Sequence, residues 1–254
     1  MRVLVCVKRV PAPGAKIVLT DDQQAVETRN LGFANSPHEE CAVEAAVQLV
    51  AEHGGESTVL TVGPPESEEQ LRYAISVGID RAVLLPTNGS DLDPQATSRA
   101  IVEGVRTLEQ RDGAFDLILF GNESADAGGY QVGVRVARGL GRPTVSGIKN
   151  IEIDDGHVVA LREIATGFEV YRLRLPAVLA VREGLNLPRY ATLPGRLKSR
   201  KAEIGEIDVA IQPGGQRMVR LASPPEEVGE TVVLGHGVAA VPRIVDILEE
   251  LGVV

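Results

Sequence analysis

Residues 121–133, GNESADAGGYQVG, carry the side chains best suited to binding a small polar ligand. They follow an apolar run and precede a helical pattern, so they are predicted to form a loop between a strand and a helix. Glycines let backbone N–H groups approach a phosphate closely. Ser124 and Gln131 offer neutral donors, and Asp126 offers an acceptor for a ribose hydroxyl or an adenine amine. The stretch predicts a nucleotide site, and a plain strand-to-helix loop is the alternative.

Bond-making chemistry has little support in the sequence. The loop is neither GxGxxG nor a Walker A motif, since no Lys-Ser or Lys-Thr follows it. The four histidines show no HxH or HExxH spacing and no GxSxG motif occurs, so neither a metal site nor a catalytic triad is expected. The pairs Glu39-Glu40 and Asp154-Asp155 are best explained as a helix cap and a turn. The chain is predicted to hold a ligand and to contact a partner, without catalysing a reaction by itself.

The composition narrows the class of protein. Of 254 residues, 44% are apolar and 24% are charged, which is typical of a globular protein. The net charge of −9 argues against nucleic acid as a partner, because phosphate contacts need a basic surface. No apolar run approaches the ~20 residues of a membrane-spanning helix. The N-terminus, MRVLVCVKRV, lacks a small-residue cleavage site, so it is interpreted as a strand and not as a signal peptide.

Two cysteines, Cys6 and Cys41, are too few and too distant in sequence for a disulfide framework or a zinc site. Both are predicted to be small core side chains in a reducing compartment. We therefore expect a cytoplasmic protein, or a mitochondrial matrix protein if the source is eukaryotic, with no transit peptide visible.

Strand-like and helix-like patterns alternate through the first part of the chain. Ser36, Pro37 and Glu39 predict a helix start with a capping box, and His53 and Gly54 predict its end. Strands are expected at 2–8, 57–63, 81–85 and 116–121, and helices at 37–53, 68–78, 94–108 and 131–141. This alternation predicts an α/β fold with a mostly parallel, doubly wound sheet of the Rossmann-like, adenine-nucleotide-binding kind.

From about residue 144 the pattern changes. An Asp-Asp-Gly turn predicts an antiparallel hairpin, FEVYRLRL and PAVLAVRE predict further strands, and 205–240 is expected to be an extended arm before a helix at Val241–Leu251. Three regions are predicted: a nucleotide-binding domain over 1–184, a recognition loop with a basic segment over 185–204, and a C-terminal arm and helix over 205–254.

In an open parallel sheet, ligands bind beyond the carboxyl ends of the strands, near helix N-termini. Four segments should therefore converge at one edge of the sheet: Cys6–Arg9, Asn35–Glu39, Val62–Pro64 and Gly121–Gly133.

Residues 185–201, LNLPRYATLPGRLKSRK, combine prolines and leucines with a basic end. An ordinary solvated loop is one interpretation. Apolar residues on a proline-stiffened loop more often mark a contact site, and a local basic patch on an acidic protein would steer it toward an acidic partner.

Several segments together resemble the β subunit of electron transfer flavoprotein. They include RVLVCVKRVP, SPHEECAVEAAVQL, LRYAISVGIDRAVLL and GNESADAGGYQVG, and the resemblance is strongest in LREIATGFEVYRLRLPAVLAVREGLNLPRYATLPGRLKSRK. It extends over nearly the whole chain.

The resemblance implies a heterodimer in which an α subunit holds most of the redox-active FAD and the β subunit buries a structural AMP. It implies electron transport from dehydrogenases, typically the acyl-CoA dehydrogenases of fatty acid oxidation, to a membrane quinone oxidoreductase. Some members of the family bind a second FAD in place of AMP and bifurcate electrons.

The resemblance also assigns residues by position. Leu193 would dock into the partner dehydrogenase with Arg196, Lys198 and Lys201 beside it, and the C-terminal arm would pack on the α subunit. The nucleotide would meet Cys6, Ser36, Pro37, His38, Glu39, Val62, Gly63, Gly121, Asn122, Glu123, Ser124, Ala125, Asp126, Ala127, Gly128, Gly129, Tyr130, Gln131 and Val132.

The chain departs from the family pattern at three places. Ser36-Pro37-His38 stands where Asn-Pro-Phe is common, Leu187 replaces a frequent acidic residue, and the loop after Asp126 has fewer carboxylates. AMP and a second FAD therefore both stay open. A stand-alone adenine-nucleotide-binding regulator is a further alternative, although such a protein needs neither the basic segment nor the arm.

Overall fold

The computed structural model describes residues 1–89, 92–225 and 231–253. The chain divides into two compact units, Met1–Arg220 and Leu221–Val254. The boundary between them lies within the region predicted as the arm. The second unit contains a short 3-10 helix, η2 (Gly237–Ala240), and the helix α6 (Val241–Glu250), close to the predicted 241–251.

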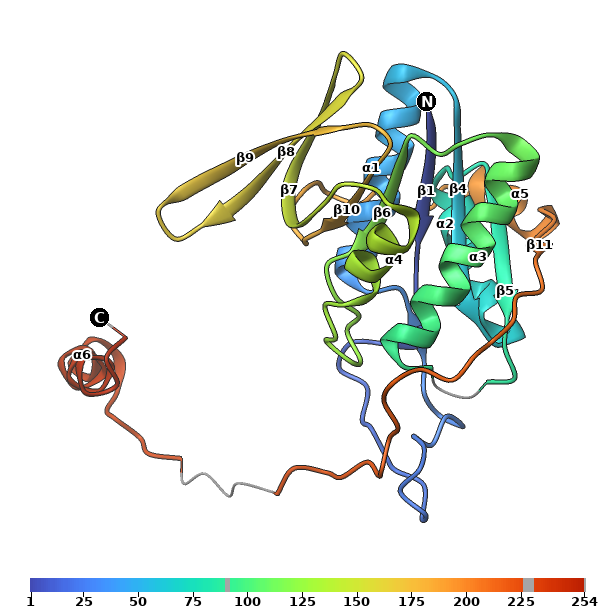
Figure 1. The fold of residues 1–254 in the computed structure, drawn as a ribbon. Coiled ribbons are helices and arrows are strands. Elements are labelled where there is room, and N and C mark those ends of the chain that lie inside the picture. The colour runs from blue at the N-terminus through green and yellow to red at the C-terminus, as the bar shows by residue number, and fades with distance from the viewer. Residues whose placement is uncertain (90–91, 226–230, 254) are drawn as a thin grey trace. The chain divides into compact units, whose positions relative to one another are not determined.

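The first unit is built on a nine-stranded sheet with the order β11-β5-β4-β1-β6-β10-β7-β8-β9 (Figure 1). Its strands are β1 (Arg2–Cys6), β4 (Glu56–Gly63), β5 (Arg81–Pro86), β6 (Leu117–Gly121), β7 (Thr144–Asp154), β8 (His157–Ile164), β9 (Gly167–Arg174), β10 (Ala177–Val181) and β11 (Gly205–Glu206). The pairs from β11 to β7 are parallel, and β7, β8 and β9 pair antiparallel. The predicted fold class, a mostly parallel sheet with added antiparallel strands, is confirmed.

Helices cover both faces of the parallel part. The helices are α1 (Pro37–His53), α2 (Glu68–Val77), α3 (Pro94–Asp112), α4 (Val132–Leu140) and α5 (Leu193–Lys201), with a 3-10 turn η1 (Pro65–Ser67) before α2. Apolar residues of α1 and α2 pack with Val3 and Val5, while those of α3 and α4 pack with Leu4 and Cys6. Because β1 is buried on both faces, its sequence is a continuous apolar run without alternation. Cys6 and Cys41 are both buried and free, as predicted.

The start of α1 is fixed by the predicted capping box. Ser36 occupies the N-cap position, where its hydroxyl accepts from the backbone N–H of Glu39, and the Glu39 side chain accepts from the backbone N–H of Ser36. Pro37 follows at the first helical position, where its missing N–H costs nothing. A small separate sheet of β2 (Val10–Pro11) and β3 (Phe33–Ala34) leads the chain into this cap.

The antiparallel strands extend from one edge of the sheet. The turn between β7 and β8 lies at Asp155 and Gly156, which confirms the hairpin predicted from the Asp-Asp-Gly sequence. Figure 1 shows the β8–β9 hairpin, in yellow, reaching away from the helices that cover the parallel strands.

The expectation of a loop over 185–201 is wrong for its second half. Residues Leu193–Lys201 form the helix α5, with Thr192 as N-cap accepting from the backbone N–H of Gly195 at 3.1 Å. Pro194 lies in the first turn, where proline is tolerated, and Lys198, Arg200 and Lys201 lie in the last turn, where cations favour the helix dipole. The same residues that suggested a stiff basic loop therefore form a short capped helix.

The residues after α5 pack back onto the first unit. β11 pairs with β5, and Ile207 is buried in the core beside α3. The carboxylate of Asp93, at the start of α3, accepts from the backbone N–H of Gln216 at 2.8 Å. Residues 205–220 are thus part of the first unit.

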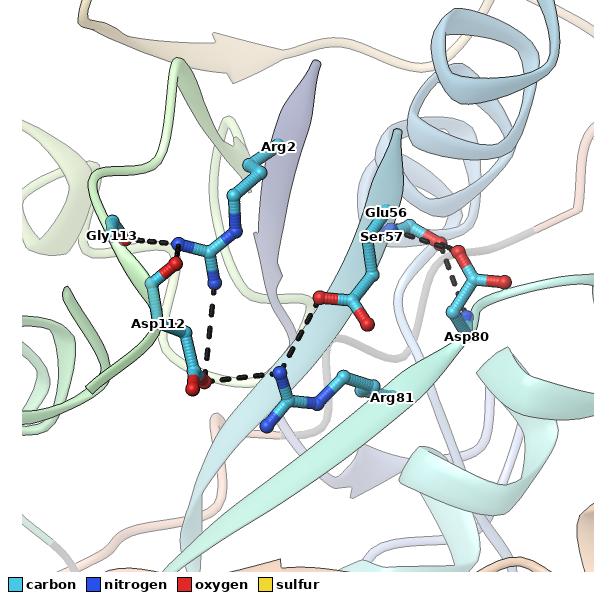
Figure 2. Close-up of polar contacts among 7 residues, drawn as sticks. All are labelled: Arg2, Glu56, Ser57, Asp80, Arg81, Asp112 and Gly113. Carbon is cyan, nitrogen blue, oxygen red and sulfur yellow. Dashed lines mark hydrogen bonds and ion pairs between the residues drawn. The ribbon is translucent and has the colours of Figure 1, made fainter. Parts of the chain in front are cut away.

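Polar contacts join the amino ends of three parallel strands (Figure 2). Arg81 of β5 contacts Glu56 of β4 at 3.3 Å and Asp112 at 3.0 Å. The Asp80 carboxylate accepts from the backbone N–H and the hydroxyl of Ser57, at 2.9 and 2.8 Å. This end of the sheet lies opposite the carboxyl ends where a ligand was predicted.

Candidate functional site

The carboxyl ends of β1 and β6 lie at the point where the strand order reverses. From β1 the chain proceeds to β4 and β5 on one side, and later to β6 and β10 on the other. In sheets of this kind the connections diverge at such a point, and ligands usually bind in the crevice beyond the strand ends. We use the word crevice for the region beyond the carboxyl ends of β1 and β6. The segments predicted to converge follow or face these strand ends.

Lys8 joins three of the predicted segments. It follows β1, its backbone N–H donates to Glu39 Oε1 at 3.0 Å, and its Nζ lies 2.5 Å from Asp126 Oδ2. These contacts connect the end of β1 with the start of α1 and with the loop after β6. The polar loop of residues 121–133 is therefore held at the crevice.

Gly121 allows the start of α1 to approach the end of β6. A Cβ on Gly121 would lie 2.8 Å from Glu39 Cγ, closer than real Cβ contacts come, and 3.1 Å from Glu39 N, which is tighter than most of them. Glycine is required here by close approach, since the backbone of β6 contacts Glu39 directly.

Glu39 is a buried carboxyl group near the carboxyl ends of β1 and β6. Its two oxygens accept from the backbone N–H groups of Lys8 and Ser36, each at 3.0 Å. Burial raises the pKa of Glu39 to about 8, although these hydrogen bonds oppose the shift. Burial, followed by the charge of Glu39, also raises the pKa of the Cys6 thiol. A protonated thiol is a poor nucleophile, so Cys6 is suited to packing and not to covalent chemistry.

Asp126 is the charged group of the loop. Burial alone would raise its pKa, but the Lys8 ammonium and hydrogen bonds from Ser124 and the Ala127 N–H outweigh burial and lower the pKa. Asp126 therefore remains a carboxylate, able to accept from hydroxyl or amine groups. Gly128 and Tyr130 adopt left-handed backbone conformations, with φ of 53° and 52°, and Tyr130 is 61% exposed.

The first turn of α4 faces this loop. Gln131 occupies the N-cap position, yet among the described residues no side chain caps the helix, and the Gln131 amide oxygen instead accepts from Arg135 at 2.9 Å. The first N–H groups of α4 therefore remain able to bind an anion such as a phosphate.

Asn35 carries an amide group suited to binding a ligand or a water. It is buried immediately before the α1 cap, and both atoms of its amide lack a hydrogen-bond partner within the described part of the chain. An unpaired buried amide is costly, and its donor and acceptor complement the edge of a nucleotide base or an ordered water. Together with Asp126 and the start of α4, this donor set fits an adenine nucleotide.

The predicted nucleotide residues separate into two groups. The first group lies at the ends of β1 and β6 and comprises His38, Glu39, Gly121, Glu123 and Asp126. Lys8 contacts Glu39 and Asp126, Gly121 approaches Glu39, and His38 Nε2 lies 3.2 Å from Glu123 Oε1. Val62 and Gly63 end the neighbouring strand β4, where a Cβ on Gly63 would lie 2.4 Å from Ser67 Oγ. Of the remaining loop residues, Ala125, Ala127 and Gly128 are exposed and Gly129 is half-buried.

The predicted docking residues lie on a different element. Leu193 begins α5 and is 72% exposed, and Leu187 and Tyr190, before it, are 90% and 94% exposed. Arg196, Lys198 and Lys201 are exposed on α5, which packs against α2. Arg72 of α2 fixes the end of α5 by donating to the carbonyl oxygens of Ser199 and Ala202.

Three further residues connect α1 with the chain before α5, and sequence analysis missed them. Glu183, Asn186 and Arg189 contact His38, Cys41 and Glu44 respectively. No local pattern could indicate these pairs, since their members are 145 residues apart.

Two further searches cover only the described residues. No helix there is long and apolar enough to cross a membrane. No group of three or more His, Cys, Asp or Glu side chains in that part of the chain is arranged to hold a metal ion.

A doubly wound sheet with a polar loop and a helix start at its switch point defines an α/β protein of the class that commonly binds ligands at this position. Comparison with known proteins is more specific. A family model described as "Electron transfer flavoprotein domain" matches residues 25–212. The "Electron transfer flavoprotein subunit beta" of Bacillus subtilis is 32% identical over 238 residues, covering 91% of each chain.

Other relatives have related names. "Protein FixA" of Azorhizobium caulinodans is 33% identical over 210 residues, covering 80% of this chain and 74% of its own. The "Caffeyl-CoA reductase-Etf complex subunit CarD" of Acetobacterium woodii is 29% identical over 247 residues, covering 92% of each chain. The chain belongs to the electron transfer flavoprotein family and is similar to its β subunits. Its role is in electron transfer.

Proposed function

We propose that this chain is the β subunit of a heterodimeric electron transfer flavoprotein. It binds an adenine nucleotide, AMP in the ordinary case, at the carboxyl ends of β1 and β6, and it pairs with an α subunit that holds the FAD. The heterodimer carries electrons from dehydrogenases, such as acyl-CoA dehydrogenases, to a quinone oxidoreductase. The observation that carries the nucleotide assignment is the convergence of Lys8, Glu39 and Asp126 from three separate segments.

Each part of the site has a role in this proposal. The first N–H groups of α4 bind the phosphate, since no described side chain caps that helix. The Asp126 carboxylate accepts from the ribose hydroxyls and remains charged because Lys8 lies beside it. Asn35 contributes an amide whose two polar atoms are otherwise unpaired in the described residues.

The docking role rests on exposure and charge. Leu193 places an apolar side chain in solvent at the start of a helix that carries Arg196, Lys198, Arg200 and Lys201. An exposed leucine on a basic helix suits a pocket with an acidic rim on the dehydrogenase. The basic helix is notable on a chain with a net charge of −9, because it opposes the average charge of the molecule.

A second FAD in place of AMP is the alternative for the same site. The similarity to a subunit of a caffeyl-CoA reductase–Etf complex supports keeping this alternative. The exposed loop residues Ala127 and Gly128 favour it too, since small side chains leave space beside the loop for a larger ligand.

One experiment distinguishes these proposals. The chain is purified with its α subunit, the complex is denatured, and the released nucleotides are identified by mass. One FAD with AMP supports the ordinary electron carrier, and two FAD support the bifurcating variant. A complex that releases no adenine nucleotide beyond the FAD of the α subunit would refute the assignment of the crevice.

A further inference from the structure

Hydrogen bonds and an ion pair join one face of α1 to residues 183–189, which lie between β10 and α5. His38 Nδ1 accepts from the backbone N–H of Glu183 at 2.7 Å. One turn further along, Asn186 Nδ2 donates to the carbonyl oxygen of Cys41 at 2.9 Å. After another turn, Arg189 donates to the Glu44 carboxylate at 2.7 and 2.8 Å. We call these three contacts the α1 clasp.

The α1 clasp has a regular geometry. Its helix residues are spaced by three, so they share one face of α1. Its partners are also spaced by three, and each pair is separated by the same 145 residues. Residues 183–189 therefore follow the helix in constant register, with a turn at 183–184 and bends at 185–186.

The far end of the α1 clasp is an ion pair with a buried partner. Glu44 is only 4% exposed, and two nitrogens of Arg189 contact its carboxylate. Burial would raise the pKa of Glu44, but the hydrogen bonds from Arg189 and Gln48 outweigh it and lower the pKa. Charge-assisted bidentate pairs fix geometry well. The chain at Arg189, immediately before the exposed Tyr190 and Leu193, is therefore anchored to α1.

The near end of the α1 clasp reaches the nucleotide loop. His38 Nε2 lies 3.2 Å from Glu123 Oε1, in the loop that follows β6. Because Nδ1 accepts a backbone N–H, the proton of the neutral imidazole lies on Nε2, where it donates to the Glu123 carboxylate. A single ring thus bridges the nucleotide loop and residue 183.

We propose that His38 is a positioning residue that couples occupancy of the nucleotide site to the conformation of residues 183–193. A bound nucleotide fixes the loop of residues 121–132 and with it Glu123. Glu123 orients the His38 ring, and the ring holds the turn at Glu183 from which the docking residues extend. This inference rests on the proposed nucleotide site and adds a regulated link from that site to the docking surface.

The test measures hydrogen exchange of the backbone amides of residues 183–193 in the complex with the α subunit. Exchange is measured for the complex with AMP bound and for the same complex after AMP has been removed by mild denaturation and refolding. A third sample has FAD added in place of AMP. In the wild type, we expect the nucleotide to slow exchange by about 5-fold or more, the lower range of measured couplings between sites. In His38→Phe, which keeps a ring but loses both hydrogen bonds, exchange should be fast with or without nucleotide.

Two controls separate coupling from general loosening. His53→Phe makes the same substitution at the other end of α1, where the side chain is outside the α1 clasp, and should preserve the nucleotide effect. Glu123→Ala should abolish the effect, whereas Glu123→Gln, which still offers an oxygen to His38 Nε2, should restore it. The Glu123 variants keep the test valid even if His38→Phe does not fold.

Linkage gives a second measurement on the same proteins. Because coupling between two sites is reciprocal, a change at Arg189 should also affect the nucleotide site. Arg189→Gln should therefore weaken AMP binding. The same substitution should weaken AMP binding by a smaller factor in a protein that already carries His38→Phe. The bound nucleotide, identified by mass, shows whether a negative result contradicts the nucleotide site or only the link through His38. A wild-type complex without nucleotide would overturn the proposed function and this link together. Bound nucleotide with the same exchange protection in wild type and His38→Phe would overturn the link alone.

Discussion

The Glu39 side chain contacts three separate parts of the fold. It completes the α1 capping box, accepts from Lys8 after β1, and contacts Gly121 at the end of β6. Its sequence position three residues after Ser36 predicted the cap. Its burial and the approach of Gly121 could not be predicted, because they depend on how the strands place α1.

The raised pKa of Glu39 predicts a specific pH dependence. A glutamate titrates near 4.5 when unfolded, and in the folded protein the pKa of Glu39 is about 8. The folded state binds this proton more tightly, so the group stabilises the fold fully below about pH 4.5 and loses this contribution as the pH rises through about 8. Glu39→Gln removes the titration. Between these pH values, the free energy of unfolding should fall more steeply for the wild type than for the variant.

Urea unfolding of the full chain at a series of pH values measures this difference. A difference between the two proteins that stays constant with pH would contradict the prediction, even if the variant is less stable throughout.

Gly121→Ala tests the close approach of α1 to β6. The added methyl would meet the Glu39 backbone and side chain, so we expect a loss of about 1–3 kcal/mol in the free energy of unfolding, together with weaker AMP binding. Gly129→Ala, in the same loop, is the matched control, because its Cβ would lie 3.7 Å from Pro94 in ordinary contact. Equal stabilities of the two variants in urea would show that the approach at Gly121 is not restrictive.

At the scale of elements, buried strands were the easiest to predict. RVLVC and LILFG are continuous apolar runs because helices cover both of their faces. Capping residues predicted where α1 begins. The convergence of Cys6–Arg9, Asn35–Glu39 and Gly121–Gly133 followed from the general position of ligands in parallel sheets.

The helix α5 shows where this kind of prediction fails. Its sequence LPGRLKSRK has a weak apolar pattern, and it is fixed by the Thr192 cap and by Arg72 of α2. Such tertiary contacts cannot be recognised in a local pattern. The contacts of His38, Cys41 and Glu44 with residues 183–189 were missed for the same reason.

Leu193→Ala tests the docking role of α5. Leu193 is mostly exposed and packs little within its own chain, so the variant should fold, pair with the α subunit and retain flavin. Loss of an anchoring leucine should slow reduction of the flavin by the dehydrogenase by roughly 10-fold or more, as truncation of an interface anchor does. Stopped-flow reduction kinetics measure this effect. Unchanged kinetics at limiting concentrations of dehydrogenase would exclude Leu193 as an anchor.

At the scale of the whole molecule, the two compact units suggest a division of roles. Residues 205–220 pack on the first unit through β11, Ile207 and the contact of Gln216 with Asp93. A chain that ends at Arg220 should therefore keep its fold and its adenine nucleotide, but it should co-purify poorly with the α subunit. Mass analysis of the bound nucleotide and a pull-down with the α subunit measure the two outcomes. Normal pairing of the shortened chain would show that residues 221–254 are not the arm that holds the α subunit.

The two ends of the parallel sheet differ in how their polar groups are paired. At the amino ends, Arg81, Glu56 and Asp112 form partly exposed ion pairs, and such pairs contribute about 0–1 kcal/mol each (Figure 2). At the carboxyl ends lie a buried carboxyl group and two features without a partner among the described residues, the Asn35 amide and the start of α4. The carboxyl ends therefore combine paired groups, such as Lys8 with Asp126, with polar groups that no described side chain satisfies.

The constant separation of 145 residues in the α1 clasp also determines how early its contacts can form during synthesis. At about 5–20 residues per second, a ribosome needs roughly 7–30 seconds to reach Arg189 after Glu44 has been added. During that interval the Glu44 carboxylate has no Arg189 to pair with, whatever else of α1 has formed. A nascent chain therefore cannot complete the α1 clasp until nearly the whole first unit has been made.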